Sequence, residues 1–500
     1  MSPAAERCDL LVIGGGVNGA GIARDAAGRG LSVVLCEQHD LAAHTSSAST
    51  KLIHGGLRYL EHYEFRLVQK ALAEREVLLA AAPHIVRPLR FVLPHEPHLR
   101  PVWMIRAGLF LYDHLARRYR LPASEAIDLR RHPAGAPLRP GYARAFAYSD
   151  AWVDDARLVV LNALDAGLRG AEILTRSRCT RLVRERGAWS ATLTVAGGGQ
   201  RRLAARAVVN ATGPWAASFL DQATPVRSRH AVRLVKGSHI VVPRLFDHDF
   251  AYIFQNVDRR IIFAIPYERE FTLLGTTDVE YAGDPARVAI DADEIAYLCE
   301  LVGRHFRQPV TPADVVWSYS GVRPLLEDES SDPSSVTRDY TVELDTDGAP
   351  LLSVFGGKLT TYRRLAEDAL ERLLPALGVG RPRWTMRAPL PGGDLPGGDF
   401  AAFRTALGAR LADFPTRLVD RWAHAYGTRL DHWLGPARSP AALGEQIVPD
   451  LYAAEVEYLR RHEWAVTAED ILWRRTKLGL HAPPDAAASL DAWLARHRTG

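Results

Sequence analysis

A glycine-rich turn near the start of the chain places the tightest constraint on its fold. An apolar run leads into Gly14, Gly16 and Gly19. The first glycine permits a tight turn, the second lets a phosphate approach the backbone, and the third lets a helix pack closely on the strand. A stretch of helical composition at residues 20–28 and a second apolar run at 31–35 complete a strand–turn–helix–strand unit. The pattern predicts a Rossmann-like domain that binds a dinucleotide.

Two further residues of this unit fit a dinucleotide. Glu37 ends the second apolar run, and an acidic side chain at that position accepts hydrogen bonds from ribose hydroxyls. Asn18 lies in the glycine turn just before the predicted helix, and at such a helix N-terminus backbone N–H groups and the positive end of the helix dipole meet phosphates. The alternative is an ordinary turn beside an exposed glutamate. NAD and FAD share the fingerprint, so it does not choose between them.

Two later segments favour a flavin. Residues 45–56 read TSSASTKLIHGG, and residues 208–216 read VVNATGPWA. Small hydroxyl residues and glycines suit a loop that follows a long cofactor, because bulky side chains would block a flavin and hydroxyls can bond its phosphate and ribityl oxygens. Each segment alone is equally consistent with a plain loop. The residues predicted to contact the cofactor in these segments are Thr45, Ser46, Ser47, Lys51, His54, Gly55 and Gly213.

The composition narrows the class of protein. A chain of 500 residues is too long for one compact core, so two or three domains are expected. Apolar residues make up 47% and charged residues 24%, which is ordinary for a globular protein and excludes disordered and collagen-like classes. The formal net charge is +4, from 62 basic and 58 acidic residues. That balance gives no indication of a nucleic-acid partner.

The cysteine spacing and the apolar runs limit the metal sites, disulfides and membrane spans that can be expected. Cys8, Cys36, Cys179 and Cys299 form no CxxC pair, so isolated thiols in a reducing compartment are expected rather than a zinc site or disulfides. No group of ligands has metal spacing, and no metal is expected. The start does not read as a signal peptide, and no run of about 18 uncharged apolar residues occurs. Membrane contact is therefore expected to be peripheral.

The order of strand-like and helix-like segments predicts an α/β fold. We expect a Rossmann-like FAD-binding domain with an inserted mixed β-sheet substrate domain and a C-terminal all-α domain. The predicted divisions are an FAD-binding domain in three parts at 1–82, 146–229 and 321–388, a cap or membrane-proximal excursion at 83–145, an antiparallel substrate-binding sheet at 230–320, a Pro- and Gly-rich linker at 389–399, and the helical domain at 400–500.

Several long motifs identify a family. They include DLLVIGGGVNGAGIARDAAGRGLSV, TSSASTKLIHGGLRYLEHYEFRLV, NATGPWA, KGSHIVVP, GTTDVEY, YSGVRPL, SVFGGKLTTYR and LWRRTKLGL. The chain resembles the aerobic, FAD-dependent glycerol-3-phosphate dehydrogenases, within the larger glycine-oxidase and D-amino-acid-oxidase-like flavoprotein fold. The resemblance covers nearly the whole chain and is weakest in the linker and at residues 400–450. In SVFGGKLTTYR it implies cofactor contacts from Gly357, Lys358, Leu359 and Thr360.

The resemblance also implies the reaction and the partners, which composition and spacing do not show. It implies oxidation of sn-glycerol 3-phosphate to dihydroxyacetone phosphate with FAD as cofactor and a membrane quinone as electron acceptor. It further implies a cytoplasmic homodimer that is attached peripherally to the inner face of the cell membrane.

Three cations are candidates for binding the substrate phosphate. Arg58, Arg323 and Lys358 stand in short glycine-bounded turns, and a phosphate dianion calls for guanidinium forks and an ammonium. The alternative for any such residue is a solvated surface charge. An idle charge is costly in these apolar, glycine-rich contexts, and the resemblance places all three at the substrate near the flavin.

His239 is the candidate for the catalytic base. Histidine has a suitable unperturbed pKa for proton transfer near neutral pH, although a lone histidine beside a strand is more often structural, and a different base or a water is the alternative. The resemblance favours His239 and makes Arg323 and Lys358 catalytic partners. Thr276 and Tyr59 are candidates for hydrogen bonds to the substrate, with Thr277 beside them. His54 is placed near the flavin, and Asp278 reads equally well as a turn residue.

Residues 100–120 have two interpretations. Their apolar and aromatic side chains are flanked by Arg100, Arg106, Arg117, Arg118 and Arg120. A helix of this kind can lie in a headgroup layer, attracted to anionic lipid, or it can pack on the substrate domain. The quinone acceptor that the resemblance implies favours the membrane interpretation.

Two other functions compete with the quinone-linked dehydrogenase. One is a related oxidase that gives its electrons to oxygen and releases hydrogen peroxide. The other, more distant, is a flavin-binding regulatory protein without turnover.

Overall fold

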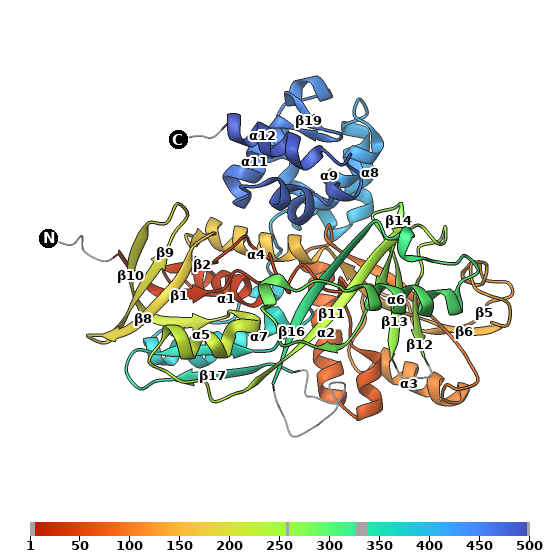
Figure 1. The fold of residues 1–500 in the computed structure, drawn as a ribbon, viewed down its shortest axis with the longest axis horizontal. Coiled ribbons are helices and arrows are strands. Elements are labelled where there is room, and N and C mark those ends of the chain that lie inside the picture. Colours follow the sequence, from red (N-terminus) through yellow and green to blue (C-terminus); the bar gives the residue numbers. More distant parts are fainter. Residues whose placement is uncertain (1–5, 257–259, 327–338, 498–500) are drawn as a thin grey trace.

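The computed structural model describes residues 6–256, 260–326 and 339–497. These residues form two large β-sheets with helices packed on them and a separate cluster of C-terminal helices that includes a small two-stranded sheet (Figure 1). In the view of Figure 1, the first sheet lies to the left, the second to the right, and the C-terminal cluster above both. The predicted mixed α/β class with a C-terminal helical domain is confirmed.

The first sheet carries the predicted strand–turn–helix–strand unit. Strands β1, β2, β7, β10 and β18 run parallel, with β17 antiparallel to β18 and a β8–β9 hairpin extending from β10. Parallel neighbours need crossover connections, and helix α1 makes the one from β1 to β2. The strands are β1 (Glu6–Ile13), β2 (Val33–Cys36), β7 (Glu172–Leu174), β8 (Arg178–Glu185), β9 (Ala188–Thr194), β10 (Gln200–Asn210), β17 (Thr341–Asp345) and β18 (Leu351–Phe355).

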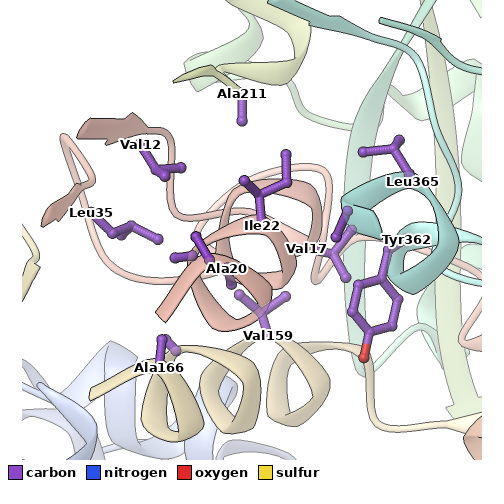
Figure 2. Packing of buried hydrophobic residues seen from close by; sticks show 14 of the residues in the cluster. Val12, Val17, Ala20, Ile22, Leu35, Val159, Ala166, Ala211, Tyr362 and Leu365 are labelled. Carbon is purple, nitrogen blue, oxygen red and sulfur yellow. The ribbon is translucent and has the colours of Figure 1, made fainter. Parts of the chain in front are cut away.

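Three helices pack against one another beside this sheet. They are α1 (Val17–Gly28), α4 (Asp155–Leu168) and α7 (Tyr362–Leu373). Figure 2 shows α1 between the other two, with Ala20 and Val159 in the seam to α4 and Leu365 facing it from α7; all three side chains are fully buried. Small residues on α1 permit the close approach, and each buried aliphatic side chain contributes about 1.5–3 kcal/mol. Helix α4 begins where the Asp154 side chain accepts from Arg157 N, a typical N-cap.

The second sheet is wider than the predicted substrate domain. Its strands come from residues 52–153 as well as 232–326, so the predicted excursion at 83–145 contributes β4 and β5 to it. Pro88 and Pro94 in β4 obscured that strand, since proline is rare inside sheets. The strands are β3 (Leu52–Ile53), β4 (Val86–Pro94), β5 (Glu125–Asp128), β6 (Arg144–Val153), β11 (Val232–Pro243), β12 (Ala251–Gln255), β13 (Ile261–Tyr267), β14 (Phe271–Gly275), β15 (Val279–Glu280) and β16 (Trp317–Leu326).

Helices and turns cover the second sheet and the outer side of the first. They are a 3₁₀ turn η1 (Leu57–His62), α2 (Phe65–Ala81), α3 (Val102–His114), α5 (Ala216–Ala223) and α6 (Ala292–His305). Helix α3 is amphipathic: Leu109 and Tyr112 are buried, whereas Trp103 is 68% and Phe110 65% exposed. Among the described residues, none of the helices is long and apolar enough to cross a bilayer.

The C-terminal domain has its own core. Its helices are α8 (Phe400–Arg410), α9 (Thr416–Tyr426), α10 (Asp431–Leu434), α11 (Ala453–Glu463) and α12 (Ala486–Arg496), and a π-helix η11 (Asp470–Arg475) follows α11. The buried side chains of these helices form one cluster, centred on Trp422, Leu459 and Leu490. A two-stranded hairpin, β19 (Gln446–Val448) and β20 (Leu451–Tyr452), interrupts the helices, so the domain is not purely helical.

Candidate active site

One large cavity is bounded by residues of both sheets. Its volume is about 630 Å³, within the range of small-molecule and cofactor sites. On one side it is lined by the β1–α1 turn and the loop after β2, and on the other by β11, β13 and β16. The predicted site residues that line it are Gly14, Gly16, Asn18, Glu37, Thr45, Ser46, His54, Tyr59, Gly213, His239, Thr276, Arg323, Gly357, Lys358, Leu359 and Thr360.

The glycine turn excludes side chains for two different reasons. Gly14 has φ +111°, and a Cβ there would lie 2.4 Å from Ala211 O; a Cβ at Gly19 would lie 1.9 Å from Gly14 O. Both glycines are therefore needed for the turn itself. Gly16 lines the cavity, and a Cβ there would meet Ser46 Oγ at 3.1 Å as its sole neighbour within 4 Å. Because Gly16 has no side chain, the space beside it stays open for a ligand and is not filled by other protein atoms.

Glu37 is held at the edge of the cavity by two backbone groups. Its Oε2 accepts from Gly15 N at 2.7 Å and its Oε1 from His39 N at 2.8 Å. Burial raises the pKa of this carboxyl, while the two N–H groups act in the opposite direction. The first turn of α1 carries no acidic residue, so its positive dipole end is available to an anion. The glycine-lined turn and the carboxylate fit the pyrophosphate and ribose of FAD.

The loop at 38–51 follows Glu37 and lines the cavity over most of its length. Thr45 Oγ1 donates to Val322 O at 2.8 Å, and Ser46 Oγ accepts from Val17 N at 3.0 Å. Lys51 is fully buried, and its Nζ donates to Asp155 Oδ1 at 2.7 Å. These bonds fix the loop to α1, β16 and α4.

Arg323 and Lys358 form a cationic region of the lining. Arg323 Nη1 pairs with Asp278 Oδ1 at 2.6 Å, and its Nη2 donates to Thr277 O at 2.8 Å. Lys358 Nζ lies 4.2 Å from the centroid of the Tyr59 ring, a cation–π contact. Two cations whose orientation is fixed by neighbours make a site suited to a phosphate dianion.

His239 of β11 lines the same cavity, within range of the Arg323 charge, and is almost completely buried. Its Nε2 lies 2.9 Å from Thr50 Oγ1, and its ring stacks on Tyr319 with centroids 4.9 Å apart. Burial, together with the charges of Lys51 and Arg323, lowers the pKa of His239 to about 3. The imidazole is therefore neutral at physiological pH.

The structure places five predicted site residues away from the cavity lining: Gly19, Ser47, Lys51, Gly55 and Arg58. Lys51 Nζ faces Asp155 and Ser47 O, so it holds the loop rather than facing a ligand. Gly55 N donates to Tyr112 Oη at 2.9 Å behind the lining. Arg58 stands on η1, half-buried. Ligand contacts from Ser47 and Arg58 stay predictions.

Sequence reasoning missed several lining residues. Thr50 lies within the TSSASTKLIHGG segment, but its contact with His239 joins residues far apart in the chain. Asp278, which the sequence presents as a turn residue, does not line the cavity but is the ion-pair partner of Arg323, which does. Phe263 and Trp215 line the cavity with ordinary local sequence. The available sequence signal was that Asp278 is an acidic residue directly after the GTT turn.

Glu37, His39 and His44 approach one another within 4.8 Å, although the sequence predicts no metal. His39 Nδ1 and His44 Nε2 lie 2.8 Å apart as a hydrogen-bonded pair, and both oxygens of Glu37 already accept backbone N–H groups. The arrangement is accounted for by hydrogen bonding.

Comparison with known proteins assigns the family. The model of the FAD dependent oxidoreductase family matches residues 9–363, and that of the C-terminal domain of alpha-glycerophosphate oxidase matches residues 384–495. A glycerol-3-phosphate dehydrogenase of Pseudomonas aeruginosa is 57% identical over 99% of this chain and 96% of its own length. A D-erythritol 1-phosphate dehydrogenase of Brucella abortus is 51% identical over 98% of each chain.

A solved structure agrees with the sequence relatives. The glycerol-3-phosphate dehydrogenase from Bacillus halodurans complexed with FAD superposes with a TM-score of 0.79 at 28% identity, covering 98% of this chain and 90% of its own. The chain therefore belongs to the FAD-dependent oxidoreductase family, carries the C-terminal domain of alpha-glycerophosphate oxidase, and uses FAD as its cofactor.

Proposed function

We propose that this enzyme oxidises sn-glycerol 3-phosphate to dihydroxyacetone phosphate by hydride transfer to FAD and then reduces a membrane quinone. The observation that carries the proposal is a single cavity lined both by the glycine turn and by Arg323, Lys358 and His239. The names of the Pseudomonas and Brucella relatives both specify the phosphate ester of a polyol, which agrees with a cationic region beside the cofactor.

Arg323 and Lys358 hold the phosphate dianion. The guanidinium offers a planar fork of donors that matches phosphate oxygens, and the ammonium adds a compact charge. Thr277 O and Asp278 already orient the guanidinium, so little side-chain freedom is lost on binding. The phosphate thereby fixes the position of the carbon that is oxidised, while Thr276 and Tyr59 lie within the same lining for hydrogen bonds to the hydroxyls.

His239 accepts the proton of the C2 hydroxyl, and Thr50 Oγ1, which lies 2.9 Å from Nε2, fixes the orientation of the ring. Neutral imidazole is the form that can take a proton. The bound dianion opposes the field of Lys51 and Arg323, so it raises the pKa of His239 from its value in the empty cavity. When bound, FAD supplies the acceptor for the C2 hydride.

We further propose that helix α3 and its surroundings contact the membrane. Trp103, Phe110 and the neighbouring Tyr63 are 65–80% exposed, and Arg106 and Arg117 are exposed on or just beyond the same helix. Aromatic side chains with adjacent cations are typical of a surface that lies in anionic headgroups. Figure 1 shows α3 at the bottom of the molecule, opposite the C-terminal domain. The enzyme would then be cytoplasmic, peripherally attached and, as in the family it resembles, a homodimer.

The substrate is tested by anaerobic mixing of the FAD-loaded enzyme with sn-glycerol 3-phosphate or D-erythritol 1-phosphate. We expect the visible absorbance of the oxidised flavin to bleach faster, at equal concentration, with glycerol 3-phosphate. Faster bleaching by the erythritol ester would assign the enzyme to the activity of the Brucella relative. An absence of bleaching with both esters would contradict a polyol phosphate as substrate.

The electron acceptor is tested by steady-state turnover with a soluble quinone analogue, compared with oxygen. We expect turnover with the quinone and hydrogen peroxide at only a small fraction of that rate. Peroxide formed in step with substrate consumption would instead favour the oxidase reaction. Light scattering of the purified protein tests the proposed dimer independently.

A further inference from the structure

The C-terminal domain reaches the active-site region through one short segment. This segment, residues 470–477, comprises the π-helix η11 (Asp470–Arg475) with Thr476 and Lys477. π-helical turns are rare and are frequent at functional sites. Ile471 and Leu472 belong to the core of the C-terminal domain, whereas Arg474 and Arg475 are buried against the FAD-binding region.

The first contact is with the loop that follows Glu37. Arg474 Nε donates to Asp40 Oδ2 at 2.7 Å, and Arg475 donates to both oxygens of Asp40 at 2.8 Å. Asp40 is 2% exposed, and Arg475 is 1% exposed. Two guanidinium groups on one buried carboxylate form a strong, geometrically specific pair. Removing one partner would leave a buried charge without compensation, which is expensive.

Asp40 lies near the start of the loop at 38–51 that lines the cofactor cavity. Ala43 N donates to Asp40 O at 3.2 Å, and Ala42 N donates to Gly15 O at 3.1 Å, so the loop is bonded to the glycine turn two residues after Asp40. The far end of the loop is fixed through Lys51 and Asp155. Lys477 Nζ of the same C-terminal segment lies 3.8 Å from the adjacent Asp154. Residues 470–477 thus approach both ends of the loop.

The second contact reaches His239 through a column of aromatic rings. Trp473 stacks on Trp317 with centroids 4.4 Å apart, and Trp317 contacts Tyr319 at 4.9 Å. Tyr319 in turn stacks on His239 at 4.9 Å with 17° between the planes. Tyr319 Oη donates to Ser49 O at 2.8 Å, which ties the column to the loop as well.

The sequence around Trp473 leaves room for its ring in this column. A Cβ at Gly479 would lie 2.5 Å from the Trp473 ring, so a glycine at that position is needed for the tryptophan to face β16. The motif LWRRTKLGL therefore contains the two arginines of the first contact, the tryptophan of the second and the glycine that accommodates it.

We propose that residues 470–477 are a positioning element of the active site. Arg474 and Arg475 hold the FAD-binding loop through Asp40, and Trp473 holds the His239 ring through Trp317 and Tyr319. None of the residues 470–477 lines the cavity, so they act through other side chains. The loop contact rests only on FAD being the cofactor, whereas the ring contact also rests on the proposed role of His239.

The loop contact is tested with Asp40→Asn. The FAD dissociation constant is measured by fluorescence as FAD is added back to the apoprotein. Arg421→Met is the matched control, because Arg421 forms a buried pair with Glu455 inside the C-terminal domain and does not contact the loop. We expect Asp40→Asn to weaken FAD binding by at least about tenfold, and Arg421→Met to lower stability with a near-normal dissociation constant.

Unchanged FAD affinity in a folded Asp40→Asn protein would overturn the loop contact. Equal loss of FAD in Arg421→Met would also overturn it, since general weakening of the domain would then suffice. If Asp40→Asn does not fold, Arg474→Gln takes its place: Arg475 still pairs with Asp40, the same weakening is expected, and unchanged affinity again contradicts the proposal.

The ring contact is tested with Trp473→Leu, and Trp433→Leu is the matched control. Both tryptophans are partly buried in the same domain, but the ring contacts of Trp433 are to Trp422 and Tyr426. We expect Trp473→Leu to lower kcat on the order of tenfold and shift its pH profile, with KM and bound FAD nearly unchanged, because ring alignment affects proton transfer. Trp433→Leu should keep the wild-type kcat and profile.

The proposed function and the positioning role of residues 470–477 can be disproved independently. If the wild-type enzyme does not reduce its flavin with a polyol phosphate, the proposed function fails, and the loop contact is still decided by FAD binding. If the wild type turns over and Trp473→Leu has the same kcat and pH profile, the ring contact is wrong. A Trp433→Leu variant as slow as Trp473→Leu would also contradict it.

Discussion

Arg323 receives its orientation from the turn between β14 and β15. Thr277 O and Asp278 occupy two of its nitrogens, and the side chain lines the cavity next to His239. A guanidinium held by an acceptor on each side can meet a phosphate with little reorganisation. At the scale of single residues, this orientation distinguishes a binding group from the solvated arginines of the surface.

Replacing Arg323 with Leu should abolish reduction of the flavin by glycerol 3-phosphate and leave FAD bound. Loss of a charge-assisted, bidentate contact removes substrate binding, whereas the glycine turn and Glu37 do not depend on Arg323. Anaerobic bleaching and the flavin content of the purified variant measure the two effects. The exposed Arg287→Leu serves as the control, with normal rates expected. Near-normal bleaching by Arg323→Leu would remove this arginine from the site.

At the scale of elements, the β1–α1 turn carries the cofactor assignment. Gly16→Val should yield a folded protein that does not retain FAD, because the added methyls enter space that the turn leaves to the ligand. Gly19→Val should instead damage the fold, since its Cβ collides with Gly14 O at 1.9 Å. Circular dichroism and flavin absorbance separate the outcomes. Fully flavinated Gly16→Val protein would contradict the assignment.

Helix α3 is the second element with a specific test. The double variant Trp103→Asp and Phe110→Asp removes two exposed aromatic side chains and adds charge that anionic lipid repels. Binding to vesicles that contain anionic lipid should fall at least about tenfold, while anaerobic reduction by substrate stays unchanged. Cosedimentation with vesicles measures the first effect. Equal vesicle binding by wild type and variant would show that α3 does not face the membrane.

Local sequence patterns predicted the elements well where packing agreed with them. The strand before Gly14, the helix at 20–28 and the strand at 31–35 all appear, with ends shifted by a few residues. The sequence analysis did not predict strand β4, because its prolines and arginines are unusual in a strand that lies in the middle of a sheet. Its partners β6 and β12 lie far along the chain, and no local pattern records that pairing.

At the scale of the whole molecule, buried neutral histidines make stability depend on pH. Burial lowers the pKa of His84 and His239 to about 3 and that of His305 to about 4, whereas the unfolded value is about 6.5. Below pH 6.5 the unfolded chain binds protons that the folded chain does not. The free energy of unfolding should therefore fall, by up to about 1.4 kcal/mol per pH unit for each histidine.

Urea denaturation at pH 7.5 and 5.5 measures this effect. The stabilisation should be complete above pH 6.5 and decrease as the pH falls towards 4. The free energy of unfolding of a His84→Gln variant should depend less steeply on pH, by the equivalent of one proton, because the glutamine side chain does not titrate. Equal stability at the two pH values would contradict the burial of these histidines in the neutral form.

The candidate site shows where sequence reasoning ends. The glycine turn, Glu37 and the hydroxyl-rich loop could be predicted because a cofactor imposes a local pattern on one segment. The resemblance supplied His239, Arg323 and Lys358. The clamp of Asp40 by Arg475 joins residues 435 positions apart, and the column from Trp473 to His239 crosses two domains. Contacts of that kind arise from tertiary packing, and no spacing of residues along the sequence indicates them.

The central claim is that this cavity holds FAD against a cationic site for a phosphorylated polyol. The most direct measurement is the visible spectrum of the purified, FAD-loaded enzyme during anaerobic titration with sn-glycerol 3-phosphate. The account predicts that the oxidised-flavin absorbance is lost as substrate is added, and that the Arg323→Leu variant stays yellow. A wild-type protein that keeps its flavin oxidised with excess substrate, or that cannot be loaded with FAD at all, would contradict it.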